Sequence, residues 1–451
     1  MVIIAELYLC AGGNPKVDKQ NEHGNIVSTN RPPKRSTKDS IVLTGEYGRS
    51  RTAFGLTEEH LDKHSLLIGS TGCGKTTLLN KMISQIQNNM TSDDVMIIFD
   101  SKGDFYSKFG MRKGSVLLGN SSQYYSASVR WNIFKEICAD GWENRSIITN
   151  SQEICKDLFA DREKRTNNPF FPNAARDLLA SLLIFLIRTG EHDITFRKDF
   201  FYNDQLKHIL DCSNADQLLT YLSYDEDARS VASYIEGNGE QSNGVLAEMY
   251  SVIRDIFIGV FAEHGTFSIR NFVRNKGGKT LYVEYDLSIG QTLTPMYRLL
   301  FDLALKEALG RHNKEGNVYL ILDEFRLLPH LQHIDDGVNF GRSLGVKVLA
   351  GIQNVEQLFE TYNENRGRSI LAGFSNLFMF HNDDPSTLKY LTQRSGNNVV
   401  LDEYQDIKGQ IAEGKPRVAH TIEDWDLISL EQGEAIISLA FGKPFRFKFD
   451  Q

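Results

Sequence analysis

Two patterns of hydrophobic positions alternate along the chain. The first is a short, continuous apolar run bounded by glycine or polar residues, which is typical of strands buried on both faces of a sheet. Runs of this kind lie at residues 41–43, 66–68, 95–99, 280–285, 318–322 and 346–351. They predict an α/β fold with a central, mostly parallel sheet.

The second pattern repeats apolar residues every three or four positions and predicts helices. It occurs at residues 147–159, 174–187, 206–222 and 245–261, with a break at 168–172, and again at 296–309. A helical block between strand-rich segments predicts an inserted all-α domain. The expected divisions are an N-terminal strand and basic arm at 1–40, the first part of the sheet domain at 41–139, the all-α insertion at 140–262, and the second part of the sheet domain at 263–451.

The N-terminal segment contains one short apolar run and otherwise follows neither pattern. That run, residues 2–10, carries Glu6 and has no basic lead, so it predicts a strand and not a signal peptide. Residues 11–40 are rich in Gly, Asn, Pro, Lys and Ser, and we expect a long loop or a partly disordered arm. Its basic cluster could touch a phosphate backbone or could simply be solvated. The cluster consists of Arg31, Lys34, Arg35 and Lys38.

Composition indicates a soluble globular protein. Of its 451 residues 41% are hydrophobic and 24% are charged, and the formal net charge is −8. An acidic protein does not grip nucleic acid over its whole surface, so any such contact must be local. The longest uncharged apolar run, 178–187, is shorter than the roughly 20 residues of a membrane-spanning helix. The five cysteines are scattered and have no metal-ligand spacing, so we expect a reduced, cytoplasmic protein.

A glycine-rich motif follows the run at 66–68. Gly69, Gly74, Lys75 and Thr76 have the spacing G-x-x-x-x-G-K-[ST], and a helical pattern follows them. Backbone N–H groups of such a loop point at phosphate oxygens, the lysine reaches the β- and γ-phosphates of ATP, and the threonine hydroxyl can hold Mg²⁺. The alternative is a chance turn between strand and helix. The candidate nucleotide ligands are Gly69, Ser70, Thr71, Gly72, Cys73, Gly74, Lys75, Thr76 and Thr77.

Acidic residues stand at the carboxyl ends of two predicted strands, where ligands bind in open α/β sheets. Asp100 follows the run at 95–99, either as part of the nucleotide site or as an ordinary strand exit. Asp323 and Glu324 follow the run at 318–322. Asp323 could hold Mg²⁺, and Glu324 could polarise a water molecule for attack on the γ-phosphate.

Two further polar residues flank the strand predicted at 346–351. Gln353 follows it and could sense the γ-phosphate, or could cap a helix or lie in a solvated turn. Arg342 precedes it. This arginine could pair with an acid of its own subunit or reach the nucleotide of a neighbouring subunit as an arginine finger.

The order of these motifs resembles a known family. The segments GSTGCGKTT, IIFDSKGD, LILDEF, FGRSLG and GIQN follow one another as in the coupling ATPases of type IV secretion and conjugative DNA transfer, within the FtsK/HerA group of ring-forming DNA pumps. The resemblance covers residues 41 to about 445 and includes the closing segment GEAIISLAFGKPFRFKF. It implies a RecA-like P-loop nucleotide-binding domain, with the all-α domain where these proteins carry one.

The resemblance also implies a role for each candidate residue. Lys75 and Thr76 would bind ATP and Mg²⁺, Asp323 would support the metal, Glu324 would activate water and Gln353 would read the γ-phosphate. Arg342 would be a finger supplied across a subunit boundary. That role requires an oligomer, expected to be a hexameric ring with DNA in its channel, and the helical domain would contact cargo or its carriers.

The chain departs from the family pattern in one respect. Many members begin with two transmembrane helices, and this sequence encodes none. We therefore expect either docking on a separate membrane-embedded secretion component, at the inner face of the membrane, or DNA movement without a secretion channel. Two other functions stay open: an ATP-gated platform that recruits relaxase or effector proteins, and a soluble DNA pump of a mobile-element or genome-defence system.

Overall fold

One large sheet forms the centre of the fold. The computed structural model describes residues 18–23, 27, 30–237, 239–405 and 411–450. The sheet has 11 strands in the order β3-β2-β14-β13-β10-β4-β9-β8-β5-β7-β6. In that order their bounds are Ser50–Thr57, Asp39–Tyr47, Phe445–Phe449, Glu434–Ser438, Asn376–Phe380, Ser65–Ile68, Val346–Ile352, Val318–Leu322, Val95–Asp100, Lys279–Glu284 and Ser115–Leu118.

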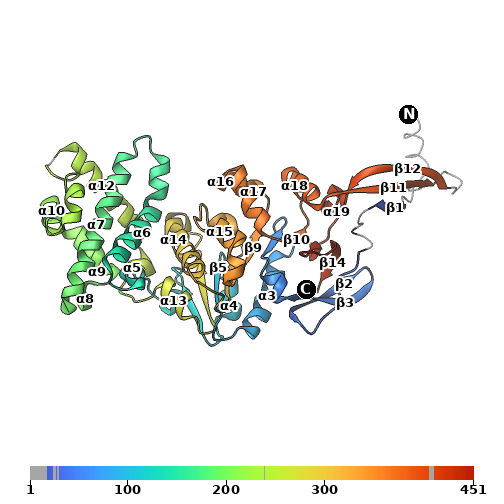
Figure 1. The fold of residues 1–451 in the computed structure, drawn as a ribbon, viewed down its shortest axis with the longest axis horizontal. Coiled ribbons are helices and arrows are strands. Elements are labelled where there is room, and N and C mark those ends of the chain that lie inside the picture. The colour runs from blue at the N-terminus through green and yellow to red at the C-terminus, as the bar shows by residue number, and fades with distance from the viewer. Residues whose placement is uncertain (1–17, 24–26, 28–29, 238, 406–410, 451) are drawn as a thin grey trace.

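The direction of the strands divides this sheet into two parts. All neighbouring pairs from β10 to β6 are parallel, whereas β13, β14, β2 and β3 add antiparallel strands beyond β10. The prediction of an α/β fold with a mostly parallel central sheet is therefore confirmed (Figure 1). The antiparallel part brings the last strand, β14, beside the early strand β2.

Alternate residues of the parallel strands face two hydrophobic cores. In β5, Met96 and Ile98 belong to a core that includes α3 (Lys75–Asn89), whereas Ile97 belongs to a core that includes α14 (Gly290–Leu309). Successive side chains of a strand point to opposite faces, so burial on both faces requires an uninterrupted apolar run. This explains why such runs predicted the central strands.

Helices cover both faces of the sheet. The core with α3 lies on one face, and the core with α14 to α18 lies on the other. The remaining helices in this half of the molecule are α2 (Glu58–Leu61), α4 (Asp104–Phe109), α15 (Ile334–Asn339), α16 (Glu356–Tyr362), α17 (Glu364–Gly373), α18 (Pro385–Ser395) and α19 (Asp424–Ile428).

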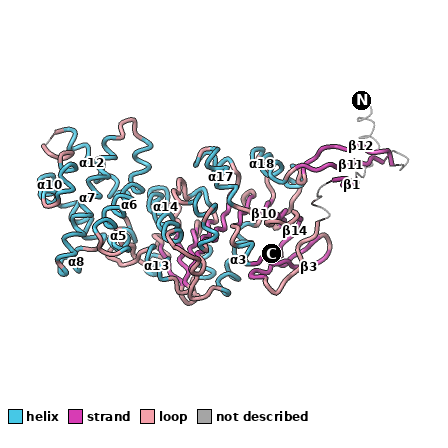
Figure 2. The backbone as a smooth tube through the Cα atoms, in the orientation of Figure 1, coloured by secondary structure: helices cyan, strands magenta, loops and turns pink. Residues whose placement is uncertain are grey.

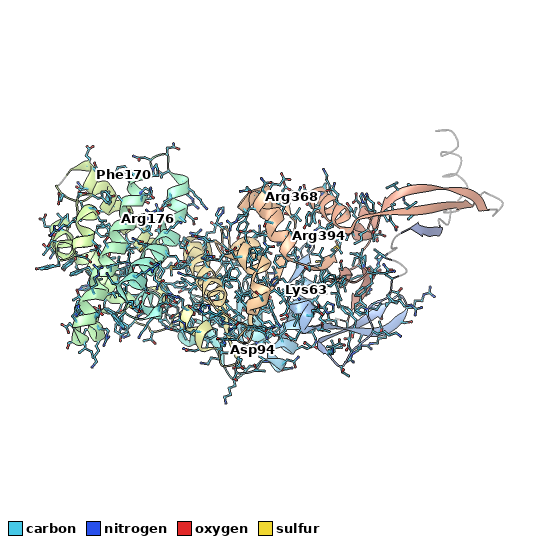
Figure 3. All side chains as sticks on the ribbon, in the orientation of Figure 1. Lys63, Asp94, Phe170, Arg176, Arg368 and Arg394 are labelled. Atoms are coloured by element: carbon cyan, nitrogen blue, oxygen red, sulfur yellow. The ribbon has the colours of Figure 1, made fainter. Side chains whose placement is uncertain are left out.

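A helical block, residues 133–275, lies between β6 and β7 and forms one end of the elongated molecule (Figures 1 and 3). It starts before residue 140 and continues past residue 262, the bounds that we expected for it. Its hydrophobic core is continuous with the core on the α14 face of the sheet. Its α-helices are α5 (Ile133–Ile137), α6 (Asn144–Arg165), α7 (Phe170–His192), α8 (Ile194–Phe200), α9 (Asn203–Cys212), α10 (Ala215–Ser223), α11 (Arg229–Ala232), α12 (Glu240–Ile256) and α13 (Ile269–Asn275).

Two helix predictions were wrong in detail. The segment 206–222 is not one helix but two, because Asn214 caps α10: its side chain accepts the N–H of Gln217, and the Gln217 side chain accepts the N–H of Asn214, each at 2.9 Å. The segment 245–261 is helical only to Ile256. The regular helix ends because Phe257 has a non-helical ψ of 71° and Ile258 is extended, and Gly259 then begins the 3-10 helix η4 (Gly259–Phe261).

A second sheet of three strands projects from the end opposite the helical block (Figure 2). Its long hairpin consists of β11 (Asn397–Gln405) and β12 (Ile411–His420), and β1 (Asp18–His23) pairs with β11. The prediction that residues 11–40 form a loop is therefore wrong for β1, since its pairing partner lies far away in the sequence. The strand expected at residues 2–10 lies outside the described residues.

Helix α7 is the candidate for a membrane span among the described residues. By length and composition it could cross a membrane, although the uncharged run within it is shorter. Of its most apolar window, 61% is buried inside the protein, and core helices of soluble proteins meet the same criterion. Here α7 packs against α6 and α12.

Candidate active site

The phosphate loop lies where the central strand β4 ends and α3 begins, so the predicted strand, loop and helix are all present. Two of its glycines adopt left-handed φ values, 80° at Gly72 and 117° at Gly74, which favour glycine. A Cβ atom on Gly69 would lie 2.6 Å from the Cβ of Phe380. The glycine spacing is thus required both by backbone conformation and by close packing.

The loop presents unused backbone donors. No group of the described residues accepts a hydrogen bond from the N–H of Gly72 or Gly74. Convergent N–H groups at a helix N-terminus attract phosphate oxygens. The loop therefore fits a polyphosphate, as its spacing predicts.

Residues from the C-terminal part of the chain hold the loop in shape. The N–H of Ser70 donates to the His381 carbonyl at 2.9 Å, the Gln432 amide to the Gly72 carbonyl at 3.0 Å, and the N–H of Gly433 to the Cys73 carbonyl at 2.9 Å. The sequence analysis missed these supports. A glycine ahead of the last strand pair is the signal that could have found Gly433, whose φ is 78°.

Lys75 is the first residue of α3 and directly follows the phosphate loop. Its side chain is buried, and its ammonium donates to the carbonyls of Gly69 and Ser70, the second at 3.1 Å. A buried ammonium held against the loop places positive charge beside the phosphate-binding donors. The Cys73 sulfur lies 3.9 Å from this ammonium, and burial raises the pKa of the Cys73 thiol.

Thr76 and Asp323 meet directly, although 247 positions separate them in the sequence. The Thr76 hydroxyl donates to Asp323 Oδ1 at 3.1 Å, and Asp323 stands where β8 ends. Burial raises the pKa of Asp323, and the hydrogen bond from Thr76 opposes that shift. A hydroxyl and a carboxylate side by side are the oxygen ligands that Mg²⁺ prefers, so the pair fits a magnesium site completed by phosphate oxygens.

The side chains of Glu324 and Gln353 also meet at this edge of the sheet. The Gln353 amide donates to Glu324 Oε2 at 3.0 Å, and Arg326 Nε lies 3.2 Å from Glu324 Oε1. The Gln353 carbonyl in turn accepts a hydrogen bond from the Asn382 side chain at 2.7 Å. The sequence analysis missed Arg326 and Asn382. The position of Arg326, two residues after Glu324, is the available signal.

Asp100 stands at the same edge, where β5 ends beside β8. Its Oδ2 accepts the N–H of Tyr106 in α4 at 2.9 Å, and its buried Oδ1 has no partner among the described residues. Burial raises the pKa of Asp100 to about 6. Asp100 therefore orders the turn into α4, and direct nucleotide binding by this residue stays a prediction.

Arg342 lies at the opposite edge of the sheet. It belongs to the 3-10 helix η6 (Gly341–Leu344), which precedes β9, whereas Gln353 follows that strand. At about 3.3 Å per residue, β9 separates the two by about 20 Å. Arg342 is exposed, and no acid of the described residues lies within 4.0 Å of its guanidinium. The structure therefore does not bring Arg342 into the site of its own chain.

Other candidate groups lie apart from this site. The basic cluster at residues 31–38 is exposed, and Arg35 lies 3.9 Å from Asp39. The four cysteines among the described residues are free thiols. Over the part of the chain that the structure describes, no three His, Cys, Asp or Glu side chains come together to hold a metal ion.

The parallel sheet and the site at its edge define a RecA-like α/β protein. The sequence matches the model of the type IV secretion-system coupling protein DNA-binding domain over residues 52–422, and the chain belongs to this family. The resemblance stated from the sequence is confirmed. None of the curated proteins compared with the chain matches it.

Solved structures share this fold. The unbound bacterial conjugative coupling protein TrwBdeltaN70 has a TM-score of 0.71 and 21% identity, with 98% of this chain and 95% of that chain covered. TrwB in complex with ADP and Mg²⁺ has a TM-score of 0.66 and 19% identity, with 98% and 96% covered. VirB4 of Thermoanaerobacter pseudethanolicus has a TM-score of 0.54 and 13% identity, with 93% and 98% covered.

Proposed function

We propose that the protein is a Mg²⁺-ATP-hydrolysing ring motor that binds and moves DNA as a coupling protein of conjugation or type IV secretion. The observation that carries this proposal is the meeting of two pairs, Thr76 with Asp323 and Glu324 with Gln353, beside the phosphate loop. The family to which the chain belongs is named for DNA binding in secretion. Solved TrwB complexes hold ADP with Mg²⁺ or a non-hydrolysable ATP analogue.

Each residue of the site has a part in the proposed reaction. The loop N–H groups and Lys75 bind the β- and γ-phosphates and neutralise their charge. Thr76 and Asp323 would hold Mg²⁺, which supplies further charge stabilisation when bound. Glu324 accepts a proton from the attacking water, and Gln353 positions the Glu324 carboxylate and senses the γ-phosphate.

The proposed motor requires neighbouring subunits. Arg342 lies about 20 Å from Gln353 in its own chain, too far for one arginine side chain to bridge. We therefore assign it as a finger that stabilises the transition state in the next subunit, in a hexameric ring with DNA in its channel. In this proposal the helical block is the inserted all-α domain that faces cargo, and the ring works in the cytoplasm beside a membrane-embedded partner.

The experiment that tests the proposed chemistry is steady-state ATP hydrolysis by purified protein. Lys75→Ala removes the phosphate-binding ammonium, and Glu324→Gln removes the base but keeps the side-chain shape. Both variants should lose hydrolysis at least a hundredfold, the scale expected for one catalytic group. Glu324→Gln should still bind ATP, which fluorescence titration with a labelled nucleotide measures. Wild-type hydrolysis in both variants would contradict the proposal.

A second function, an ATP-gated platform that recruits proteins, is favoured by one observation. A groove of about 820 Å³ lies where α6, α7 and α12 meet the start of α14. Its lining includes the apolar side chains of Phe171 and Ile256 and the ion pair of Arg162 with Asp255 at 2.6 Å. Such a groove fits a peptide of a relaxase or effector. ATP-dependent movement on naked DNA without any protein partner would exclude a platform that does not move DNA.

A further inference from the structure

Exposed aromatic side chains lie on the face that carries Arg342. Phe340 is 69% exposed and stands two residues before Arg342. Phe441 is 95% exposed, in the turn between β13 and β14. Large aromatic side chains are normally buried in a protein core. Where they are this exposed, they mark interaction surfaces.

The backbone at Phe441 gives a second reason to look for a partner. Its φ is 63°, in the left-handed region that glycine or asparagine adopts readily and a bulky residue does not. Gly442 follows at once, so a more suitable turn residue is available one position away. Core packing does not account for a phenylalanine here, since the ring is almost fully exposed.

Phe340, Arg342 and Phe441 belong to one patch. The Lys63 ammonium lies 4.0 Å from the centre of the Phe441 ring and 2.9 Å from Glu59 Oε1 (Lys63 is labelled in Figure 3). Lys63 and Arg342 precede the neighbouring parallel strands β4 and β9, so both lie at the same edge of the sheet. We call Phe340, Arg342 and Phe441, together with Lys63 and Glu59, the finger-side patch.

The opposite edge of the sheet carries a complementary surface. Trp425 is 51% exposed and Ile428 is 47% exposed, and their i, i+3 spacing puts them on one face of α19. A ring nitrogen of His381 lies 2.9 Å from the Ile428 carbonyl, and the His381 carbonyl accepts the N–H of Ser70 in the phosphate loop. We call Trp425 and Ile428 the nucleotide-side patch, because α19 adjoins the loop.

Charge also favours contact between the two patches. Helix α19 carries Asp424 and Asp426 beside Trp425, and no ion pair among the described residues includes either of these acids. The nearby acids Glu423, Glu431 and Glu434 already lie within ion-pair distance of Arg417, Lys448 and Arg446. The finger-side patch offers the unpaired Arg342, with Lys443 two positions after Phe441. Glu59 is the opposing charge there, and Lys63 already neutralises it.

We propose that Phe340 and Phe441 are the apolar anchors by which one copy of this chain docks, head to tail, on Trp425 and Ile428 of the next copy. This proposal rests on the proposed function, since that function needs Arg342 beside the neighbour's nucleotide. Because the two patches differ and lie on opposite edges, the interface is heterologous, and repetition of it closes a ring. The aromatic anchors would hold the finger in register with the phosphate loop of the neighbour.

The test uses two variants of the full chain, each with one patch removed. Phe340→Ser with Phe441→Asn removes the finger-side anchors, and asparagine keeps the left-handed turn. Trp425→Ala with Ile428→Ser removes the nucleotide-side anchors. Each protein is studied in a Glu324→Gln background with ATP, so that nucleotide is retained, and mass is measured by sedimentation velocity over a range of concentrations. Met111→Ser, a residue that is 97% exposed outside both patches, is the matched control.

The expected pattern is specific to head-to-tail docking. Each variant alone should stay monomeric at tenfold higher concentration than the parent, whereas the control should assemble like the parent. An equimolar mixture of the two variants should form a dimer and no larger species, because one intact patch of each kind remains. Assembly of either variant alone like the parent would overturn the proposal, as would a mixture that stays monomeric.

A crosslink identifies the occupant directly. A benzoylphenylalanine at position 441, in a mixture of isotopically light and heavy chains, should crosslink to a peptide containing residues 425–428 of the other chain. Crosslinks to added DNA instead would overturn the proposal in favour of a nucleic-acid contact. If the wild-type chain assembles but hydrolyses no ATP, the proposed function fails while the docking proposal stands. If hydrolysis is normal and the patch variants assemble like the parent, only the docking proposal fails.

Discussion

The carboxylate of Glu324 is the reactive group of the proposed chemistry, and a different side chain lies beside each of its two oxygens. Gln353 donates to Oε2 at 3.0 Å, and Arg326 Nε lies 3.2 Å from Oε1. A general base must be free to accept a hydrogen bond from the attacking water, and the ion pair with Arg326 competes for Oε1. Arg326 therefore limits how freely Glu324 can bind that water.

Replacement of Arg326 by alanine should raise the DNA-independent rate of ATP hydrolysis. The Arg326 side chain is 48% exposed, and such an ion pair contributes about 0.5–1 kcal/mol, which corresponds to a two- to fivefold rate change. Arg326→Lys keeps the charge and should stay near the wild-type rate. Steady-state kinetics at saturating ATP measure both. A loss of activity in Arg326→Ala would show that Arg326 assists the reaction.

At the scale of elements, a buried polar cluster joins the helical block to the sheet half. Asp157 of α6 accepts a hydrogen bond from the Gln332 side chain, and Asp302 of α14 accepts the N–H groups of Gln332 and His333. Burial raises the pKa of Asp157 to about 7, with the nearby Asp302 adding to the shift. The segment that follows Glu324 thus ends in contacts with α6, which gives the site a physical connection to the helical block.

The pKa of Asp157 predicts how stability depends on pH. An unfolded aspartate titrates at about pH 4, so between about pH 4 and pH 7 the folded protein binds more protons at Asp157 and stability falls as the pH rises. Asp157→Asn should therefore be more stable than wild type at pH 8, and that advantage should shrink by up to about 3 kcal/mol at pH 5.

Denaturant unfolding at pH 5 and pH 8 measures this difference. Asp216→Asn, on the exposed surface of α10, is the control for the replacement of a carboxylate by an amide. An Asp157→Asn advantage of equal size at both pH values would contradict the assignment of a raised pKa to Asp157.

The turn before β13 is an element that supports the phosphate loop from outside. Gln432 donates to the Gly72 carbonyl at 3.0 Å, and the loop must keep that carbonyl away from the phosphates. Gln432→Ala should weaken ATP binding about fivefold, the effect of one hydrogen bond of about 1 kcal/mol. Equilibrium titration with a labelled nucleotide measures the change. Gln241→Ala on the surface of α12 is the control, and equal affinities for the two variants would contradict a supporting role.

The elements that the sequence predicted well are those with local signals. A strand buried on both faces needs a continuous apolar run, and a phosphate loop needs glycines at fixed spacing, so β4, β5, β8, β9 and the loop were all found. The β11–β12 hairpin and β1 were missed because distant pairing, not a local pattern, defines them. Asn382 and Gln432 were missed for the same reason, since each acts on a residue that only folding brings near. Arg326 was missed although it lies only two positions after Glu324.

At the scale of the whole molecule, the two edges of the sheet carry different parts of the proposed active site. One edge carries Lys75, Asp323 and Glu324, and the other carries Arg342. In the proposed ring, each chain therefore contributes two halves of a site that a neighbour completes. Activity would then be a property of the assembly.

Mixing of two inactive variants tests completion in trans. Arg342→Ala lacks the finger but keeps Glu324, and Glu324→Gln lacks the base but keeps the finger. In a random equimolar ring about one quarter of the interfaces pair an intact finger with an intact base, so the mixture should regain up to about one quarter of the wild-type rate. A mixture as inactive as its components would contradict action in trans.

The most direct test of the central claim is the rate of ATP hydrolysis per subunit as a function of protein concentration, alone and with single-stranded or duplex DNA, with Glu324→Gln as the blank. For a DNA-assembled ring motor, the rate should rise steeply with concentration and DNA should stimulate it, because both promote completion of the site by a neighbour. A rate per subunit that is independent of concentration and of DNA, yet abolished in the blank, would contradict a DNA-assembled ring motor.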